Sequence, residues 1–87
     1  MLEGRSAKME QIIEGIARSI VFDEDDLTVE AAPGMYQTRV TLRASSRDVG
    51  KLLGRHGKTV TAMRFLTDLI AEKNGSDPCT IWVEGSV

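Results

Sequence analysis

The sequence predicts one small α+β domain whose elements follow the order helix, strand, strand, helix, helix, strand (α-β-β-α-α-β). Three observations lead to this prediction. The chain has 87 residues, which is enough for one small domain. Apolar residues recur with the helical period near the beginning of the chain and again after residue 57. In three shorter segments they alternate with polar residues, as strands do.

The first helix is predicted to carry its apolar stripe from Met9 onward. The stripe has the spacing i, i+3, i+4, i+7, i+8, and its members are Met9, Ile12, Ile13, Ile16, Ala17, Ile20 and Val21. The acidic run at 23–26 ends the helix in a polar turn. Residues 1–8 lack the pattern, so we expect an N-terminal extension or an expression remnant there and the domain itself over 9–87.

Two strands joined by a turn come next. Leu27, Val29 and Ala31 alternate with polar residues, and Pro33-Gly34 is a strong turn signal. In the second strand one face is expected to hold Tyr36, Thr38, Val40 and Leu42, and the other Gln37, Arg39, Thr41 and Arg43. The pattern predicts a hairpin.

Two helices and a last strand complete the chain. Ser45 and Asp48 resemble a capping box at the start of a short helix that runs to Gly54. The longer helix after Gly57 ends at Asn74-Gly75, and its core positions are expected to be Val60, Met63, Leu66, Leu69 and Ile70. The last strand, 79–84, places Cys79, Ile81 and Val83 on one face and Trp82 on the other.

The charges are unevenly distributed along the chain. The net charge is −2, yet residues 1–32 hold three basic and eight acidic residues, a net of −5. Residues 43–64 have a net of +5, because only Asp48 opposes Arg43, Arg47, Lys51, Arg55, Lys58 and Arg64. Such a domain can present a basic surface to nucleic acid although it is acidic overall. The alternative is that these charges are solvated helix faces.

Several classes of protein are excluded or disfavoured. No apolar run approaches the roughly 20 residues of a membrane span, and no signal peptide is visible. Cys79 alone cannot form an internal disulfide, and this fits a reducing cytoplasm. Ligands at metal spacing are absent, and His56 has no nucleophile and carboxylate in a recognisable arrangement. We therefore expect no metal, no cofactor and no enzymatic activity.

The segment Gly54-Arg55-His56-Gly57 joins the two helices through a sharp turn. Glycine allows positive φ and close approach of another backbone. The second helix begins just after Gly57, so its free N–H groups and positive dipole end point toward the turn and favour an anion such as phosphate. A helix corner without a ligand is the alternative. The spacing excludes a P-loop, and no strand leads into the turn as a Rossmann fingerprint requires.

The stretch "LLGRHGKTV", with Gly50-Lys51 before it and "TAMRFL" after it, resembles the signature of the KH domain, whose Gly-x-x-Gly loop clamps about four nucleotides. The element order is similar to the type II KH arrangement, and the short chain resembles the small bacterial KH proteins called KhpA. The resemblance implies a three-stranded mixed sheet with three helices packed on one face. It also implies single-stranded RNA binding, a role as RNA chaperone or post-transcriptional regulator, and pairing with itself or with a larger KH protein, KhpB.

Carried over from this resemblance, the residues that contact RNA would be Lys51, Gly54, Arg55, His56, Gly57, Lys58 and Arg64. The floor beneath the loop or the wall of a base-binding groove would be formed by Gly50, Leu52, Leu53 and Val60. The turn around Pro33-Gly34, which borders the groove in this type of domain, is short, and this suggests limited sequence specificity.

The alternative function is a protein-interaction or dimerisation module that keeps the fold and binds RNA weakly. Phe65 and Trp82 are surplus apolar residues, expected on the same side of the molecule and away from the loop. A homodimer, or a heterodimer with a larger KH protein, would bury them and leave the loops free.

Overall fold

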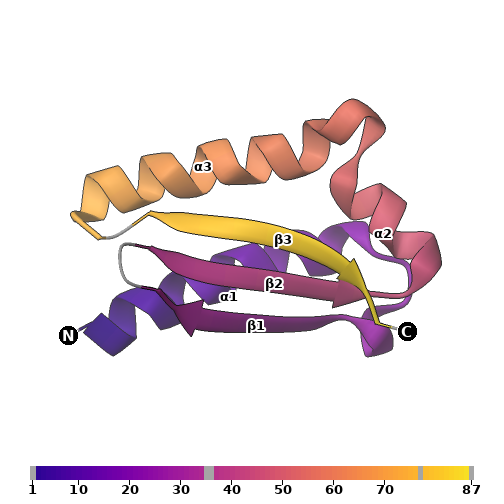
Figure 1. Cartoon of the computed structure of the whole chain (residues 1–87), viewed down its shortest axis with the longest axis horizontal. Coiled ribbons are helices and arrows are strands. Elements are labelled where there is room, and N and C mark those ends of the chain that lie inside the picture. The colour runs from indigo at the N-terminus through magenta and orange to yellow at the C-terminus, as the bar shows by residue number, and fades with distance from the viewer. Residues whose placement is uncertain (1, 35–36, 77, 87) are drawn as a thin grey trace.

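The computed structural model describes residues 2–34, 37–76 and 78–86. Its elements are α1 (Leu2–Ile20), β1 (Thr28–Pro33), β2 (Thr38–Ala44), α2 (Ser46–Leu53), α3 (Lys58–Asn74) and β3 (Cys79–Gly85) (Figure 1). Two one-turn 3₁₀ segments, η1 (Glu24–Asp26) and η2 (Arg55–Gly57), lie between α1 and β1 and between α2 and α3. The α-β-β-α-α-β order predicted from the sequence is confirmed.

The three strands form one mixed sheet in the order β1-β2-β3. Strand β1 is antiparallel to β2, with Val29 opposite Leu42 and Ala31 opposite Val40. Strand β3 is parallel to β2, with Val40 opposite Ile81. A parallel pair needs a long crossover connection, and α2 and α3 together supply it. The predicted hairpin and mixed sheet are confirmed, while Tyr36 lies outside the described residues.

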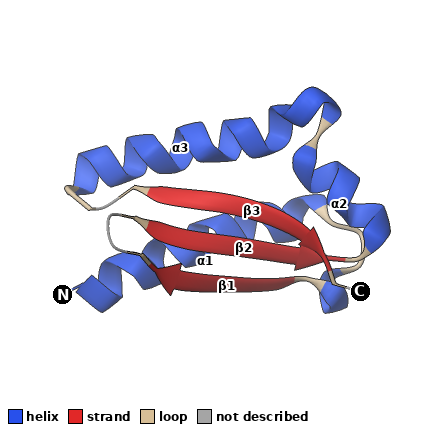
Figure 2. Cartoon of the chain, viewed as in Figure 1, coloured by secondary structure: helices blue, strands red, loops and turns tan. Residues whose placement is uncertain are grey.

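All three helices cover the same face of the sheet (Figure 2). Helix α1 lies behind β1 and β2, α3 runs along β3, and α2 sits at the end where β2 leaves the sheet. The inward-facing strand residues Val40, Leu42 and Ile81 are almost fully buried against these helices. The opposite face, which carries Arg39 and Trp82, has no element of the described chain over it. The protein is therefore a two-layer sandwich with one open sheet face.

Helix α1 begins at Leu2, ahead of Met9, where the apolar stripe starts. Residues 2–8 contain no proline, so the sequence allows the helix to continue toward the N-terminus ahead of the apolar stripe. Within the described residues, no helix combines the length and the apolar character that a membrane crossing demands.

The core-facing side of α3 differs from the prediction. Leu66 and Leu69 are each 47% exposed, whereas Thr67 and Ala71 are buried. Apolar residues occupy more than one flank of this helix, so the helical period alone allows two rotational positions. The structure selects the position that buries Val60, Met63, Thr67 and Ala71. The assignment of Leu66 and Leu69 to the core was wrong.

The predicted capping box at α2 does not form either. Ser45 is the N-cap residue, but no side-chain cap hydrogen bond is present. The carboxylate of Asp48 instead accepts hydrogen bonds from the backbone N–H groups of Phe22 (2.9 Å) and Asp23 (2.8 Å) and from the Ser45 hydroxyl (3.2 Å). Two backbone N–H donors from the segment that follows α1 thus take the acceptor that the local pattern assigns to α2.

This contact ties α1 to α2 through a fully buried carboxylate. Burial alone raises the pKa of Asp48, but the hydrogen bonds from Phe22, Asp23 and Ser45 and the nearby Lys51 ammonium favour the charged form, and the resulting pKa is lowered. Asp48 therefore stabilises the N-terminal end of α2, the end farther from the glycine loop.

Candidate nucleic-acid interface

The Gly54–Gly57 loop is a tight turn held by backbone hydrogen bonds. The N–H of Gly54 donates to the carbonyl of Gly50 (2.9 Å) and ends α2, and the N–H of Gly57 donates to the carbonyl of Gly54 (3.1 Å) and closes the turn. Gly54 has φ 78° and ψ 169°, and Gly57 has φ 74° and ψ 15°. The backbone of Gly54 lies in a region that is essentially restricted to glycine, whereas that of Gly57 lies in the left-handed helical region, which glycine adopts most easily.

Gly54 is also sterically required. A β-carbon at this position would lie 2.6 Å from the backbone nitrogen of Thr59, in the first turn of α3, and would overlap the Thr59 side chain. At Gly57 a β-carbon would meet nothing within 4 Å. The close approach of Thr59 was not foreseen from the sequence, because it depends on the angle at which α3 leaves the turn.

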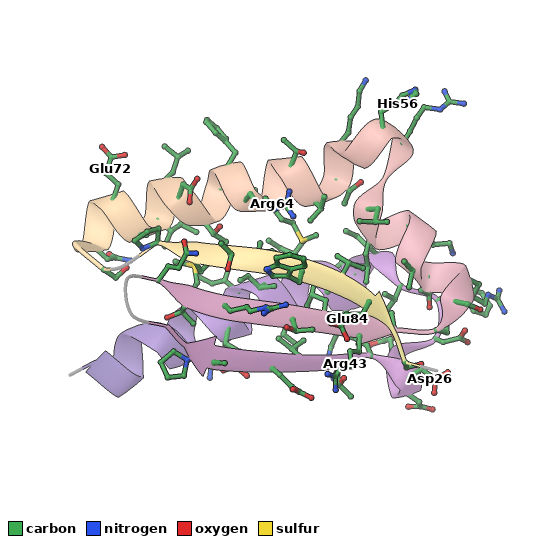
Figure 3. The ribbon with its side chains drawn as sticks, in the orientation of Figure 1. Asp26, Arg43, His56, Arg64, Glu72 and Glu84 are labelled. Atoms are coloured by element: carbon green, nitrogen blue, oxygen red, sulfur yellow. The ribbon has the colours of Figure 1, made fainter. Side chains whose placement is uncertain are left out.

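His56 adopts a left-handed conformation with φ 56° and ψ 29°. It is the only non-glycine residue with positive φ in the described part of the chain. This conformation costs a non-glycine residue about 1 kcal/mol, and such outliers concentrate at ligand-binding sites. Figure 3 shows His56 at the outer tip of the turn, directed away from the sheet.

The cations around the loop are exposed and lack acidic partners. Arg55, His56 and Lys58 are all exposed, and no salt bridge joins any of them to another described residue. Gly57 is the N-cap of α3 and has no side chain to cap the helix. The first turn of α3 without a side-chain cap, the positive end of the helix dipole and three basic side chains therefore meet at one exposed corner, an arrangement suited to bind an anion.

Two predicted contact residues point elsewhere. The Lys51 ammonium lies 3.9 Å from the Asp48 carboxylate and 5.4 Å from the centre of the Phe22 ring, so it faces the α1–α2 junction. Arg64 donates from Nη2 to the backbone carbonyl of Ile81 (2.9 Å) and lies between α3 and β3 (Figure 3). The structure thus brings Arg55, His56 and Lys58 together and leaves the other two cations on the flanks.

The predicted floor and wall residues divide by burial. Leu52 and Val60 are buried and pack in the core beneath the loop. Leu53 is 38% exposed, and Gly50 is exposed in open surroundings, where an added β-carbon would meet nothing within 4 Å. Leu53 and Gly50 are accordingly the members of this set that a ligand beside the loop could touch.

Phe65 and Trp82 do not share a face. Phe65 is 63% exposed and lies on α3 away from the residues that pack on the sheet. Trp82 is 51% exposed and projects from the open face of the sheet, since its neighbours Ile81 and Val83 face the helices. The expectation that both lie on one side was wrong, because the helix layer and the sheet layer present opposite outer surfaces.

Sequence reasoning missed Phe22, an exposed aromatic residue that follows α1. The Arg47 guanidinium lies 4.2 Å from the centre of its ring, and Lys51 approaches the same ring. No pattern in the sequence indicates this cluster, because β1 and β2 separate Phe22 from α2 along the chain.

The α-β-β-α-α-β order, the mixed sheet and the Gly-x-x-Gly turn between α2 and α3 together define a KH domain of type II. The model of the KH domain of KhpA and KhpB matches residues 10–80. The chain belongs to the KhpA/KhpB family of KH-domain proteins.

Several curated relatives carry the name RNA-binding protein KhpA. The protein of Borreliella burgdorferi is 38% identical over 63 residues, which cover 72% of this chain and 77% of the relative. The protein of Treponema pallidum is 40% identical over 57 residues, covering 66% and 71%. The protein of Clostridium acetobutylicum is 31% identical over 65 residues, covering 75% and 87%. The family to which this chain belongs is thus one of RNA-binding proteins.

Proposed function

We propose that this protein binds single-stranded RNA by holding its phosphates at the Gly54–Gly57 loop. The observation that carries the proposal is the coincidence, at one corner, of a glycine-bounded turn, an α3 N-terminus without a side-chain cap, and the basic side chains of Arg55, His56 and Lys58, which have no acidic partner among the described residues. Relatives named RNA-binding protein KhpA support the same ligand class.

The mechanism is electrostatic and steric, with no catalytic step. Gly54 and Gly57 let the RNA backbone approach the peptide backbone, the α3 N–H groups and basic side chains contact about two phosphates, and neighbouring bases lie beside Leu53 and Gly50. Contacts to phosphate carry little sequence information, which suits an RNA chaperone or post-transcriptional regulator in the cytoplasm. A larger KhpB-like KH protein is the partner we propose besides RNA itself.

The test is a charge reversal at the tip of the loop. Arg55→Asp combined with His56→Asp should lower the affinity for a labelled tetranucleotide by at least about 10-fold, measured by fluorescence anisotropy, because two phosphate contacts become repulsive. Both side chains are exposed, so the far-UV circular dichroism spectrum should stay native. Unchanged affinity in a natively folded variant would remove the loop from the binding mechanism.

A second function, association with another KH chain, is supported by the outer flank of α3. Phe65, Leu66 and Leu69 are 63%, 47% and 47% exposed, and Leu69 lies about one helical turn beyond both Phe65 and Leu66. An apolar cluster of this kind on a small domain marks an interaction surface more often than a lone exposed residue does. Pairing through this flank would leave both glycine loops accessible, and two loops on one RNA strand would raise avidity.

Phe65→Glu tests this association, with Phe22→Glu as the matched control. The two phenylalanines have nearly the same exposure, 63% and 65%, but only Phe65 lies on the α3 flank. Light scattering at high micromolar concentration should show a dimer for the unmutated protein and for Phe22→Glu, and a monomer for Phe65→Glu. A monomer in all three would refute self-association, and a pull-down with a KhpB-like protein would then test the heterodimer.

A further inference from the structure

The open face of the sheet carries one large aromatic side chain, Trp82, among polar neighbours. The described face has three rows set by the strand register: Ala32-Arg39-Thr80, Glu30-Thr41-Trp82 and Thr28-Arg43-Glu84. Trp82 is 51% exposed and occupies the middle position of the edge strand β3. About half of this residue's surface is thus presented to solvent on the open face.

The two arginines of this face differ in their partners. Arg43 donates to Glu30 (3.0 Å) and to Glu84 (3.1 Å), so its charge is matched within the sheet. The guanidinium of Arg39 lies 4.5 Å from the centre of the Trp82 ring, and no ion pair joins it to another described residue. The aromatic ring can stack on a base, and the guanidinium N–H donors beside it can bind a phosphate. The pair therefore matches the two parts of a nucleotide.

The position of Trp82 also connects it to the glycine loop. Arg64 lies on α3 about two turns beyond Gly57, roughly 10 Å along the helix axis. Its guanidinium reaches the carbonyl of Ile81, the residue next to Trp82, at the edge of β3 (Figure 3). An RNA strand that leaves the loop along this flank of α3 therefore passes the Arg64 cation. It then arrives at the edge strand β3, which carries Trp82.

We propose that the open sheet face is a second nucleotide-contact site, in which a base of the same RNA strand stacks on Trp82 while Arg39 contacts its phosphate. This inference rests on the proposed function of the glycine loop and extends the RNA footprint beyond the nucleotides that the loop holds. It assigns a role to Trp82, the one tryptophan of the chain, and to Arg39 beside it, which has no acidic partner among the described residues.

The surroundings favour RNA over a protein as the occupant of this face. Protein interfaces are depleted of glutamate, yet Glu30 and Glu84 share this face with Trp82. Base stacking needs only one aromatic surface and tolerates polar neighbours. The other cation-flanked aromatic residue, Phe22, adjoins the acidic run at 23–26, which repels phosphate. Phe22 therefore serves as a matched control that should not bind RNA.

Trp82 is the single tryptophan of the chain, so intrinsic fluorescence reports on this site directly. We expect dodecauridylate to quench the tryptophan emission of the unmutated protein and tetrauridylate to bind without quenching it. If one RNA instead bridged the glycine loops of two protomers, its affinity would rise but the tryptophan emission would not change. Quenching therefore distinguishes base stacking from avidity.

Substitutions give the second readout, by anisotropy of the labelled RNA. Trp82→Leu should weaken dodecauridylate binding roughly 5- to 100-fold, the range for loss of one stacked base, and leave tetrauridylate binding unchanged. Trp82→Tyr should restore most of the affinity, and Phe22→Leu should have no effect. Arg39→Gln should make the slope of log affinity against log salt less negative by about 0.7.

The outcomes distinguish this inference from the function on which it rests. If labelled dodecauridylate binds but the emission stays constant, or if Trp82→Leu binds it as tightly as the unmutated protein, the sheet site is wrong and the loop function stands. An emission change that depends on protein concentration without RNA would assign Trp82 to a protein interface. If no RNA binds at all, both proposals fail.

Discussion

The two ends of helix α2 use charge in opposite ways. At its N-terminal end the buried carboxylate of Asp48 accepts two backbone N–H groups and a hydroxyl, and Asp23 lies 3.8 Å from Arg47. At its C-terminal end Arg55 and His56 are exposed, without an acidic partner among the described residues. The charges at the first end are paired within the described chain, whereas those at the second end are left available for the ligand that we propose.

This contrast would allow a protein with a net charge of −2 to bind RNA at the loop, as we propose. Acidic groups such as Asp48 and Glu84 are engaged with donors or cations away from the loop. The exposed cations at the loop keep their full effect at short range, where screening by about 0.1 M salt matters least. Local pairing, more than total charge, decides where an anion can bind.

The largest expected effect comes from Gly54, where the C-terminal end of α2 depends on backbone shape. Gly54→Ala should lower Tm by about 15 °C, because the backbone lies in a region essentially restricted to glycine and a β-carbon would overlap Thr59. Gly57→Asn should lower Tm by only a few degrees, since its left-handed conformation suits asparagine and its surroundings are open. Equal decreases in the Tm of the two variants, measured by thermal unfolding, would contradict the distinction between the two glycines.

A smaller loss of stability is expected from Asp48 at the other end of α2. Asp48→Asn should lower Tm by about 10 °C at pH 7, because two backbone N–H groups lose a charged acceptor. RNA affinity, measured well below Tm, should change by less than about twofold. A folded variant that has lost RNA binding would show that the two ends of α2 are not separable.

The same residue makes the stability depend on pH. Since the folded-state pKa of Asp48 is lowered, its contribution is fully present above the ordinary value of 3.8 and is lost as the pH falls through the lowered pKa. The difference in Tm between the unmutated protein and Asp48→Asn should therefore be constant near neutral pH and shrink below about pH 4. A difference that grows in acid would reverse the sign of the assigned shift.

The smallest effect we predict in detail concerns single charges along α3. Lys58→Glu and Lys73→Glu make the same change at the first and last turns of one helix. Lys58→Glu should weaken binding to a short RNA about 5- to 20-fold at ~0.1 M salt. It should also make the slope of log affinity against log salt less negative by about 0.7, starting from a value of about −2 to −3. Lys73→Glu should leave both quantities unchanged. Equal effects would mean that the overall field, and not the loop, governs binding.

Much of this architecture was already determined by the sequence. The stripe from Met9 to Val21 specifies a one-sided helix, the alternation around Val40 specifies a half-buried strand, and Gly75 ends α3 in the left-handed conformation expected of a C-terminal glycine. The "GRHG" motif located the loop and its cations. These features depend on neighbours a few residues away, which is the range that periodicity and turn chemistry describe.

Only the tertiary structure decided the remaining features. It chose which flank of α3 is buried, and so exposed Leu66 and Leu69 while covering Thr67. It brought the Asp48 carboxylate into contact with the backbone of Phe22, 26 residues away, and placed the Lys51 ammonium beside that carboxylate. It also placed Trp82 against Arg39, on the face opposite Phe65. Each of these outcomes depends on which elements pack together, and a local pattern that fits two arrangements equally well cannot select between them.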